Sequence, residues 1–307
     1  MIDILLALYN GEKYLAEQLD SILAQTFEDW RLIICDDGSK DRSYEIAQSY
    51  AQKYPQKIKL YKNTVPSGSA QANFMGLLRY AEAEYVMFSD HDDVWLPEKI
   101  ETTLKKMKEL ESKNDTPVLV HSQLLIADNE MNVLHNSFTR YQGLNPGHKS
   151  LNRLMVQNNV TGCTVMINRK LLEIVKNAPI DEMLMHDWWF ALAAAAFGEI
   201  GFIETPLIKY RQHGNNQLGA VNNRSIKGAF KIIAERTKTK KRVSMTYTHA
   251  ESFYKFYKDA LSEEKRKCIE DYLLIPQKNK FVRAVKLIKG GYLKQNFMTA
   301  VGQLMFC

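Results

Sequence analysis

The chain has 307 residues, of which 45 % are hydrophobic and 25 % are charged, and its formal net charge at pH 7 is +6. This length and composition predict a folded globular protein with a substantial core and exclude a disordered or fibrous chain. The four cysteines have no paired spacing, so neither a disulfide framework nor a zinc site is expected.

The start of the chain argues against export. The first apolar run, residues 2–8, follows Met1 without a basic region and soon meets polar Asn10 and Glu12. Such a run is too short for a signal peptide or a membrane-spanning helix. We therefore expect a cytoplasmic protein.

Strands and helices are predicted to alternate through the first half of the chain. Short apolar runs predict strands within residues 2–10, 30–41, 57–63 and 84–93. Apolar residues at helical spacing predict helices within residues 13–25, 47–54 and 69–83. This order predicts an α/β fold with a mainly parallel central sheet and flanking crossover helices.

Polar clusters follow three of these strands, at residues 9–11, 36–39 and 90–93. Ligands of open parallel sheets bind outside the carboxyl ends of the strands, so we expect the three clusters to share one crevice. No G-x-G-x-x-G follows the first strand and no P-loop lysine motif is present. A dinucleotide dehydrogenase and a P-loop hydrolase are therefore both disfavoured.

The segment "SDHDDVW" carries three carboxylates in four positions, at Asp90, Asp92 and Asp93. Charges packed so closely repel one another unless a cation joins them. Such a cluster can hold a hard divalent cation that also binds phosphate oxygens. A carboxylate after the second strand can accept hydrogen bonds from a base or a sugar. Together these features indicate a nucleoside diphosphate ligand.

Charge is unevenly distributed along the chain. Residues 222–307 contain 19 Lys and Arg against 7 Asp and Glu, whereas residues 1–221 contain 22 against 28. A basic segment rich in Phe, Tyr and Ile can lie on an anionic membrane surface. A helical subdomain whose charges merely face water is equally compatible with this composition. Nucleic acid is not expected as a partner, because no recognised binding motif accompanies the charge.

Several motifs together resemble a known family. "LLALYNGEKYLAEQLDSILAQTFEDWRLIICDDGSKD" and "SDHDDVWLPEKI" resemble family 2 glycosyltransferases of the GT-A fold, and the "DxDDVW" form resembles bacterial rhamnosyltransferases of surface polysaccharide assembly. The likeness continues through "TGCTVMINR", "HDWWFALAAAAFG" and "PLIKYRQHGNN". It implies a glycosyltransferase domain over residues 1–221, with the nucleotide sugar bound by residues 1–115 and the acceptor by residues 116–221. A basic, mainly helical extension is expected over residues 222–307.

The resemblance implies a donor site with a divalent cation, Mg²⁺ or Mn²⁺. Asp90 and Asp92 match the family's metal motif, with Asp92 favoured as the direct ligand, and His213 would approach the metal or the diphosphate from a loop that closes over the donor. Such a cation stabilises the negative charge that develops on the departing phosphate. The other residues expected around the nucleotide sugar are Ala7, Tyr9, Glu12, Asp37, Asn73 and Arg211.

These donor-site residues have distinct expected roles. Asp37 would accept a hydrogen bond from the pyrimidine ring, whereas Asp36 is expected to bond its own turn. Arg211 could pair with a phosphate in fork geometry. Many family members have Ala-Arg-Asn where this chain has Gln-Ala-Asn at residues 71–73, so no phosphate-facing arginine is expected there. Asn73 could still position Asp90.

The family's catalytic base matches Asp187, which would remove the proton of the attacking acceptor hydroxyl. Taken alone, an aspartate before an apolar helical run is as compatible with a helix N-cap. His186 stands where the wider family usually has an acidic residue, and an acceptor contact is one possible role for it. Trp188 or Trp189 could stack on a sugar face, although one of the two must face inward. Gly162, in "TGCTVMINR", is also placed on the acceptor side.

The resulting prediction is an inverting, metal-dependent glycosyltransferase. Family likeness suggests dTDP-L-rhamnose as donor and a saccharide, such as a lipid-linked oligosaccharide at the inner membrane face, as acceptor. A UDP-hexose donor would use the same residues. Two more distant alternatives are a metal-dependent nucleotidyltransferase or phosphohydrolase, and a noncatalytic scaffold at a membrane surface.

Overall fold

The computed structural model describes residues 1–213 and 236–306. The chain forms two compact units that alternate along the sequence. The first unit comprises Met1–Phe138, Thr161–Ile180 and the described part of Glu199–Gly219. The second comprises Thr139–Val160, Asp181–Gly198 and the described part of Ala220–Cys307. The expected domain boundary after residue 221 stays a prediction.

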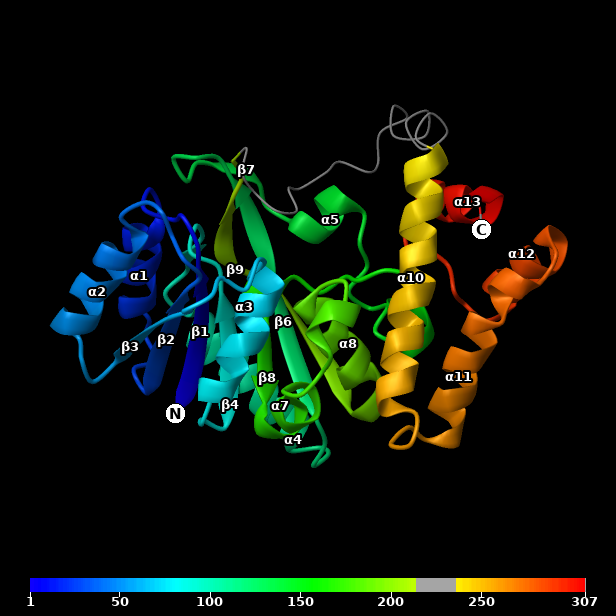
Figure 1. The fold of residues 1–307 in the computed structure, drawn as a ribbon, viewed down its shortest axis with the longest axis horizontal. Coiled ribbons are helices and arrows are strands. Elements are labelled where there is room, and N and C mark those ends of the chain that lie inside the picture. The colour runs from blue at the N-terminus through cyan, green and yellow to red at the C-terminus, as the bar shows by residue number, and fades with distance from the viewer. Residues whose placement is uncertain (214–235, 307) are drawn as a thin grey trace. The chain divides into compact units, whose positions relative to one another are not determined.

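The first unit is built on a sheet whose initial strands are parallel. β1 (Ile2–Leu8), β2 (Trp30–Asp36), β3 (Ile58–Lys62) and β4 (Tyr85–Ser89) lie in the order β3-β2-β1-β4 (Figure 1). Every residue of β1 is buried, which matches its nearly continuous apolar sequence, because strands in a parallel sheet are covered on both faces. Leu8 pairs with Asp36 and Leu6 with Ser89, so these three strands end close together.

The rest of the sheet is mixed. β8 (Met166–Asn168) is antiparallel to β4, and β6 (Val118–Ala127) is antiparallel to β8. β9 (Glu199–Arg211) runs parallel to β6, and β5 (Val94–Trp95) and β7 (Val133–His135) add antiparallel pairs. The α/β fold class expected from the sequence is confirmed. The parallel arrangement holds for β1 to β4, and antiparallel pairing begins where β8 joins β4.

Helices pack against this sheet along their apolar sides. α2 (Ser43–Lys53) contacts β2 and β3, α3 (Ala70–Leu77) contacts β1 and β2, and α4 (Lys99–Glu111) contacts β6, β8 and β9. α1 (Leu15–Leu23) packs against α2 and β5. The remaining short helices of this unit are η1 (Leu78–Tyr80), η2 (Gly162–Thr164) and α7 (Arg169–Val175).

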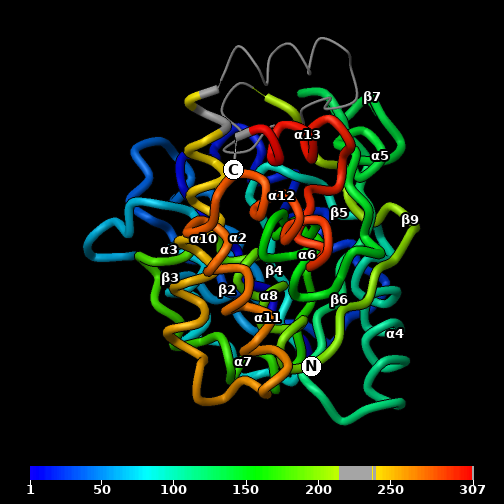
Figure 2. Tube along the Cα trace, turned by 90° about the vertical axis from the view of Figure 1, so that its right-hand side faces the viewer, coloured from blue at the N-terminus to red at the C-terminus, as the bar shows by residue number. Residues whose placement is uncertain are grey.

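The second unit is helical. It contains α6 (Leu151–Leu154), α8 (His186–Phe197), α10 (Arg236–Tyr257), α11 (Glu263–Leu273), η4 (Ile275–Gln277), α12 (Lys280–Lys289) and α13 (Phe297–Phe306). The two short helices α5 (Phe138–Gln142) and η3 (Ile180–Glu182) lie where the chain passes between units. Figure 2 shows α11, α12 and α13 following one another in orange and red.

An aromatic core holds the second unit together. Trp189 of α8 is fully buried against Phe253 and Tyr257 of α10, with ring centroids 5.3 and 6.0 Å away. The helical character expected for the C-terminal extension is confirmed over residues 236–306. In the described part of the chain, no helix is both long enough and apolar enough to cross a membrane.

Candidate active site

The polar clusters that follow β1, β2 and β4 lie side by side. The Asn10 N–H donates to Ser39 Oγ at 3.0 Å, and the Gly11 N–H donates to Ser43 Oγ at 2.7 Å. His91 Nδ1 lies 3.4 Å from the carbonyl oxygen of Ala7. A Cβ on Gly11 would lie 2.4 Å from His91 Cδ2, so any other residue at this position would have to displace the imidazole. The register of the parallel strands therefore brings the three loops together.

The two aspartates after β2 have different partners. The carboxylate of Asp36 accepts hydrogen bonds from the N–H groups of Gly38, at 3.2 Å, and Ser39, at 3.3 Å, as expected for a turn aspartate. Gly38 has φ +82°, which glycine adopts without strain. Asp37 is 5 % exposed, and its Oδ1 accepts from Asn63 Nδ2 at 2.7 Å. Its carboxylate also accepts from the N–H and the hydroxyl of Ser67, at 2.6 and 2.8 Å.

The remaining residues expected at the nucleotide lie on the same loops. Tyr9 is 50 % exposed, and Glu12 Oε2 accepts from the Arg42 N–H at 3.0 Å. Asn73 is buried, and its amide donates to the carbonyl oxygen of Cys35 at 3.0 Å. Asn63 Nδ2 also lies 3.4 Å from Asn73 Oδ1, so Asn73 is next to the partner of Asp37. Its expected role toward Asp90 stays a prediction.

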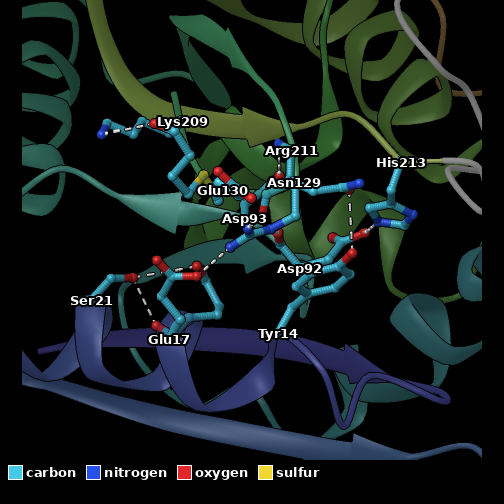
Figure 3. Close-up of polar contacts among 12 residues, drawn as sticks. Tyr14, Glu17, Ser21, Asp92, Asp93, Asn129, Glu130, Lys209, Arg211 and His213 are labelled. Carbon is cyan, nitrogen blue, oxygen red and sulfur yellow. Dashed lines mark hydrogen bonds and ion pairs between the residues drawn. The ribbon is translucent and has the colours of Figure 1, made fainter. Parts of the chain in front are cut away.

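Asp92 lies beside His213 (Figure 3). Asp92 Oδ2 and His213 Nε2 are 2.8 Å apart, and both side chains are largely buried. The imidazole of His213 stacks on the ring of Tyr14, with centroids 5.1 Å apart. The rest of the "YRQHGNN" motif, from Gly214 on, lies outside the described residues, and so does the loop expected to close over the donor.

Arg211, the last residue of β9, supports the loop of residues 90–93, called the Asp92 loop or acidic loop. Its Nε donates to the carbonyl oxygen of Asp92 at 2.9 Å, and the other two guanidinium nitrogens donate to the carbonyl of Asn129 and to the carboxylate of Glu17. The guanidinium also lies 4.4 Å from the centre of the Tyr14 ring. The whole residue is only 2 % exposed. These contacts hold the loop in place, and the expected pairing of Arg211 with a phosphate stays a prediction.

Two carboxylates of the acidic loop, residues 90–93, lie close to a cysteine of η2. Ligand atoms of Asp90, Asp93 and Cys163 all lie within 4.8 Å of one another. Asp93 is fully buried, and its Oδ1 accepts from the Arg211 N–H at 3.2 Å. Burial and the neighbouring carboxylates of Asp92 and Asp90 raise the pKa of Asp93. Cys163 belongs to η2, which begins at Gly162, a residue expected on the acceptor side.

Lys99 is a buried cation that sequence reasoning missed. Its Nζ lies 4.0 Å from the centre of the Trp95 ring, and the residue is 0 % exposed. Burial lowers its pKa to about 7, while the nearby Cys163 and Asp93 act in the opposite direction. Neither Lys99 nor Cys163 has a local sequence signal, because both meet the acidic loop through tertiary contacts.

The side chains around Asp92 fit a divalent cation. Carboxylate oxygens are the ligands that Mg²⁺ and Mn²⁺ prefer, and imidazole nitrogen also suits Mn²⁺. Asp92 Oδ2 and His213 Nε2 are adjacent, although the segments that follow β4 and β9 supply them from distant parts of the sequence. Asp90 adds a half-buried carboxylate on the same loop. That Asp90, Asp92 and His213 bind the cation stays a prediction.

In the second unit, Asp187 lies in the first turn of α8. The N-cap position belongs to Met185, which makes no side-chain capping bond, so Asp187 lies in the first turn rather than at the cap. Asp187 is 8 % exposed, and its Oδ1 accepts a hydrogen bond from Asn158 Nδ2 at 3.1 Å. Asn158 also bonds both ways with the backbone of Val160, which fixes its amide. Sequence reasoning missed Asn158, since it lies 29 positions before Asp187.

The neighbours of Asp187 are more buried than expected for an acceptor surface. His186 is 4 % exposed, and burial lowers its pKa to about 3, so its imidazole is neutral at physiological pH. The Trp188 indole N–H donates to the carbonyl oxygen of Leu154 at 2.6 Å. Trp189 is fully buried and donates to the Tyr257 hydroxyl at 3.2 Å. The expectation that Trp189 could stack on a sugar is wrong, because neither face of its ring is accessible.

Comparison with known protein structures identifies the class of fold. The sheet and helices are those of a GT-A glycosyltransferase. They resemble the crystal structure of Staphylococcus aureus TarS residues 1–349 with UDP-GlcNAc, with a TM-score of 0.55, 15 % identity, and coverage of 99 % of this chain and 90 % of that one. They also resemble the mannosyltransferase PcManGT from Pyrobaculum calidifontis with GDP-Man and Mn²⁺, with a TM-score of 0.52, 15 % identity, and coverage of 98 % and 77 %.

Comparison of the sequence with known families and proteins identifies the family. The model of glycosyl transferase family 2 matches residues 3–174. The dTDP-rhamnosyl transferase RfbG of Shigella flexneri is 30 % identical in an alignment of 247 positions, which covers 74 % of this chain and 78 % of that protein. The chain belongs to glycosyl transferase family 2 and is a glycosyltransferase of the hexosyltransferase type.

Proposed function

We propose that this enzyme is an inverting, metal-dependent glycosyltransferase that moves L-rhamnose from dTDP-L-rhamnose to a saccharide hydroxyl in bacterial surface polysaccharide synthesis. The observation that carries the proposal is the pairing of Asp92 with His213 beside the loops that hold Asp37. The likeness to a dTDP-rhamnosyl transferase supports the choice of donor.

In this proposal the first unit binds the nucleotide sugar. Asp37 faces the pyrimidine, with Asn73 behind it and with Ala7, Tyr9 and Glu12 around the base and ribose. A carboxylate oxygen can accept two hydrogen bonds, so Asp37 Oδ2 can accept from a pyrimidine N–H beside the Ser67 hydroxyl. Asp90, Asp92 and His213 hold Mg²⁺ or Mn²⁺. When bound, the cation supplies positive charge that stabilises the nucleoside diphosphate as it leaves. The solved mannosyltransferase with Mn²⁺ supports a divalent cation.

The second unit supplies the base. Asp187 takes the proton from the acceptor hydroxyl while that oxygen bonds to C1 of the sugar. The bond between C1 and the phosphate oxygen breaks at the same time, and the electron pair leaves with the nucleoside diphosphate. A single displacement inverts the configuration at C1. Asn158 donates to one oxygen of Asp187 and thereby orients the carboxylate.

The acceptor is proposed to be a lipid-linked oligosaccharide at the inner face of the plasma membrane, so that the cytoplasmic enzyme works as a peripheral protein. Gly162, His186 and Trp188 are the remaining acceptor-side candidates. Trp188 is partly exposed and fixed by Leu154, which makes it the better stacking surface. The neutral imidazole of His186 could take part only as a hydrogen-bonding group, without charge.

A UDP-hexose donor is the second candidate. A structural neighbour was solved with UDP-GlcNAc, and a uracil ring offers the same N–H to Asp37 as thymine does. Family membership disfavours both distant alternatives, because the family model is that of glycosyl transferases and not of nucleotidyltransferases or noncatalytic scaffolds.

The test is release of nucleoside diphosphate from a panel of dTDP- and UDP-sugars, with and without Mg²⁺ or Mn²⁺. Asp187→Asn should lower turnover at least about a hundredfold while donor binding survives. Asp181→Asn, an exposed aspartate nearby in sequence, is the control and should keep activity. Turnover with UDP-glucose but not dTDP-L-rhamnose would select the second candidate. Loss of donor binding in Asp187→Asn would contradict its role as base.

A further inference from the structure

α12 and the segments on either side of it carry positive charge without acidic residues. Residues 272–306 include six basic side chains and no Asp or Glu. Lys286 lies 3.9 Å from Asp271, and Arg283 donates to the carbonyl oxygen of Lys278 at 2.6 Å. Lys278, Lys280 and Lys289 are exposed, and the described residues offer them no ion pair. The net positive charge is therefore presented to the surroundings.

Large apolar side chains are exposed on the same segment. Phe281 is 79 % exposed and Ile288 is 56 % exposed. They stand seven positions apart on α12, which places them on one face of the helix. Leu287 is the buried residue of α12, so the helix already packs through another side. Leu274, before η4, and Phe297, at the start of α13, are also exposed, at 42 % and 77 %.

Lysines flank the exposed apolar side chains of α12. On a helix with 3.6 residues per turn, Lys280 and Lys289 project to opposite sides of the stripe that Phe281 and Ile288 form. Exposed aromatic and aliphatic side chains flanked by lysines are typical of helices that lie in a membrane interface. The apolar side chains enter the boundary between headgroups and acyl chains, while the lysines stay at the phosphates. An acidic, fully solvated partner would attract the lysines, but it would offer no apolar surface to Phe281 and Ile288.

We propose that α12 lies flat on a membrane that contains anionic phospholipids, with Phe281 and Ile288 inserted and with Lys278, Lys280 and Lys289 at the headgroups. These five residues are called the α12 surface. The inference narrows the membrane contact of the proposed function to one helix, and it holds for any donor sugar. It requires no spanning helix, and none is found in the described residues. A peripheral contact of this kind would hold the enzyme where lipid-linked acceptors are found.

The test is co-sedimentation of the full chain with vesicles. Vesicles of equal parts phosphatidylglycerol and phosphatidylcholine should bind the protein, and pure phosphatidylcholine should bind it weakly. The double variants Phe281→Ser with Ile288→Ser, and Lys280→Glu with Lys289→Glu, should each lower binding to anionic vesicles at least about tenfold. The lysine pair should also remove the dependence of binding on salt.

Matched controls exist in the first unit. Val65 and Leu134 are exposed aliphatic residues, and Lys105 and Lys108 are exposed lysines on α4. Val65→Ser with Leu134→Ser, and Lys105→Glu with Lys108→Glu, should leave vesicle binding unchanged. With a water-soluble acceptor, the rate of nucleoside diphosphate release should be the same for the α12 variants and the wild type. That assay separates failure of the membrane contact from failure of the transferase proposal.

Two outcomes would overturn the inference. Equal loss of binding in the α12 and control variants would mean that general charge, and not this helix, attracts the vesicles. Alternatively, the wild type could ignore vesicles and form dimers that Phe281→Ser with Ile288→Ser dissolves. The α12 surface would then be a contact between two copies of the chain.

Discussion

Arg211 and Glu17 form an ion pair that ties the end of β9 to α1 behind the Asp92 loop (Figure 3). The arginine is buried, whereas the Glu17 side chain is 54 % exposed. One turn further along α1, Ser21 Oγ accepts a hydrogen bond from the Trp95 N–H at 3.0 Å. α1 therefore anchors both the segment that follows the acidic loop and the arginine that binds the Asp92 carbonyl. The position of Asp92 therefore depends on residues outside its own loop.

Arg211→Lys should weaken this arrangement. A lysine has one nitrogen, which cannot reproduce contacts to the Asp92 carbonyl, the Asn129 carbonyl and Glu17 together. The free energy of unfolding should fall by about 3 kcal/mol, because buried carbonyl groups lose their donor. The Mn²⁺ concentration for half-maximal activity should rise as Asp92 becomes less fixed. Urea denaturation and metal titration measure the two effects.

Glu17→Gln is the companion variant. It keeps an oxygen that can accept from Arg211 and removes only the charge of a half-exposed group, so the cost should be about 1 kcal/mol or less. If Arg211→Lys kept wild-type stability but lost affinity for the nucleoside diphosphate, the arginine would be a phosphate ligand instead of a support for the loop.

His213→Ala should raise the metal requirement. Removal of the imidazole takes away one of the donors next to Asp92, so the Mn²⁺ concentration for half-maximal activity should rise at least about tenfold. His135→Ala, at an exposed histidine of β7, is the control and should not change the titration. An unchanged metal titration in His213→Ala would remove His213 from the ligand set and leave the carboxylates to hold the cation.

The meeting of the three polar loops could be predicted from the sequence because it follows from local patterns. Apolar runs mark β1, β2 and β4, and a parallel sheet aligns their carboxyl ends. Asp36 was also predicted correctly as a turn aspartate, since its partners are only two and three positions away. These features depend on spacing along the chain.

The partners of the site residues could not be predicted in the same way. Glu17 meets Arg211 across 194 positions, and Ser67 meets Asp37 across 30. Such pairs depend on how elements pack, which no single stretch of sequence encodes. The choice between Trp188 and Trp189 was open for the same reason, because α8 is apolar on nearly every side and its inward face is set by α10.

Asn158→Asp should change the pH dependence of catalysis. Asn158 Nδ2 donates to Asp187, and a carboxylate at that position would place a second negative charge beside the proposed base. A like charge raises the pKa of its neighbour, so the acid limb of the kcat/KM profile should move up by about one pH unit. Asn177→Asp, at an exposed asparagine, is the control. An unshifted acid limb would show that Asp187 is not the group that titrates in catalysis.

Lys99 should make the stability of the protein depend on pH. Burial lowers its pKa from an ordinary 10.5 to about 7, whereas in the unfolded chain it stays protonated up to about pH 10.5. Between these values the unfolded state holds more protons than the folded state, so the free energy of unfolding should rise with pH across this window. Below about pH 7 the ammonium is charged in both states, and its full burial cost remains.

Lys99→Met should remove that rise and stabilise the protein most near or below neutral pH, because an apolar chain of similar length replaces a buried ammonium that lacks a hydrogen-bond partner among the described residues. Lys105→Met changes an exposed lysine of the same helix and should keep the wild-type slope. Urea denaturation from about pH 6 to pH 10 compares the three proteins and covers most of the window. Identical slopes in both variants would mean that Lys99 stays protonated in the folded protein, held by Asp93 and by the face of Trp95 more strongly than burial opposes it.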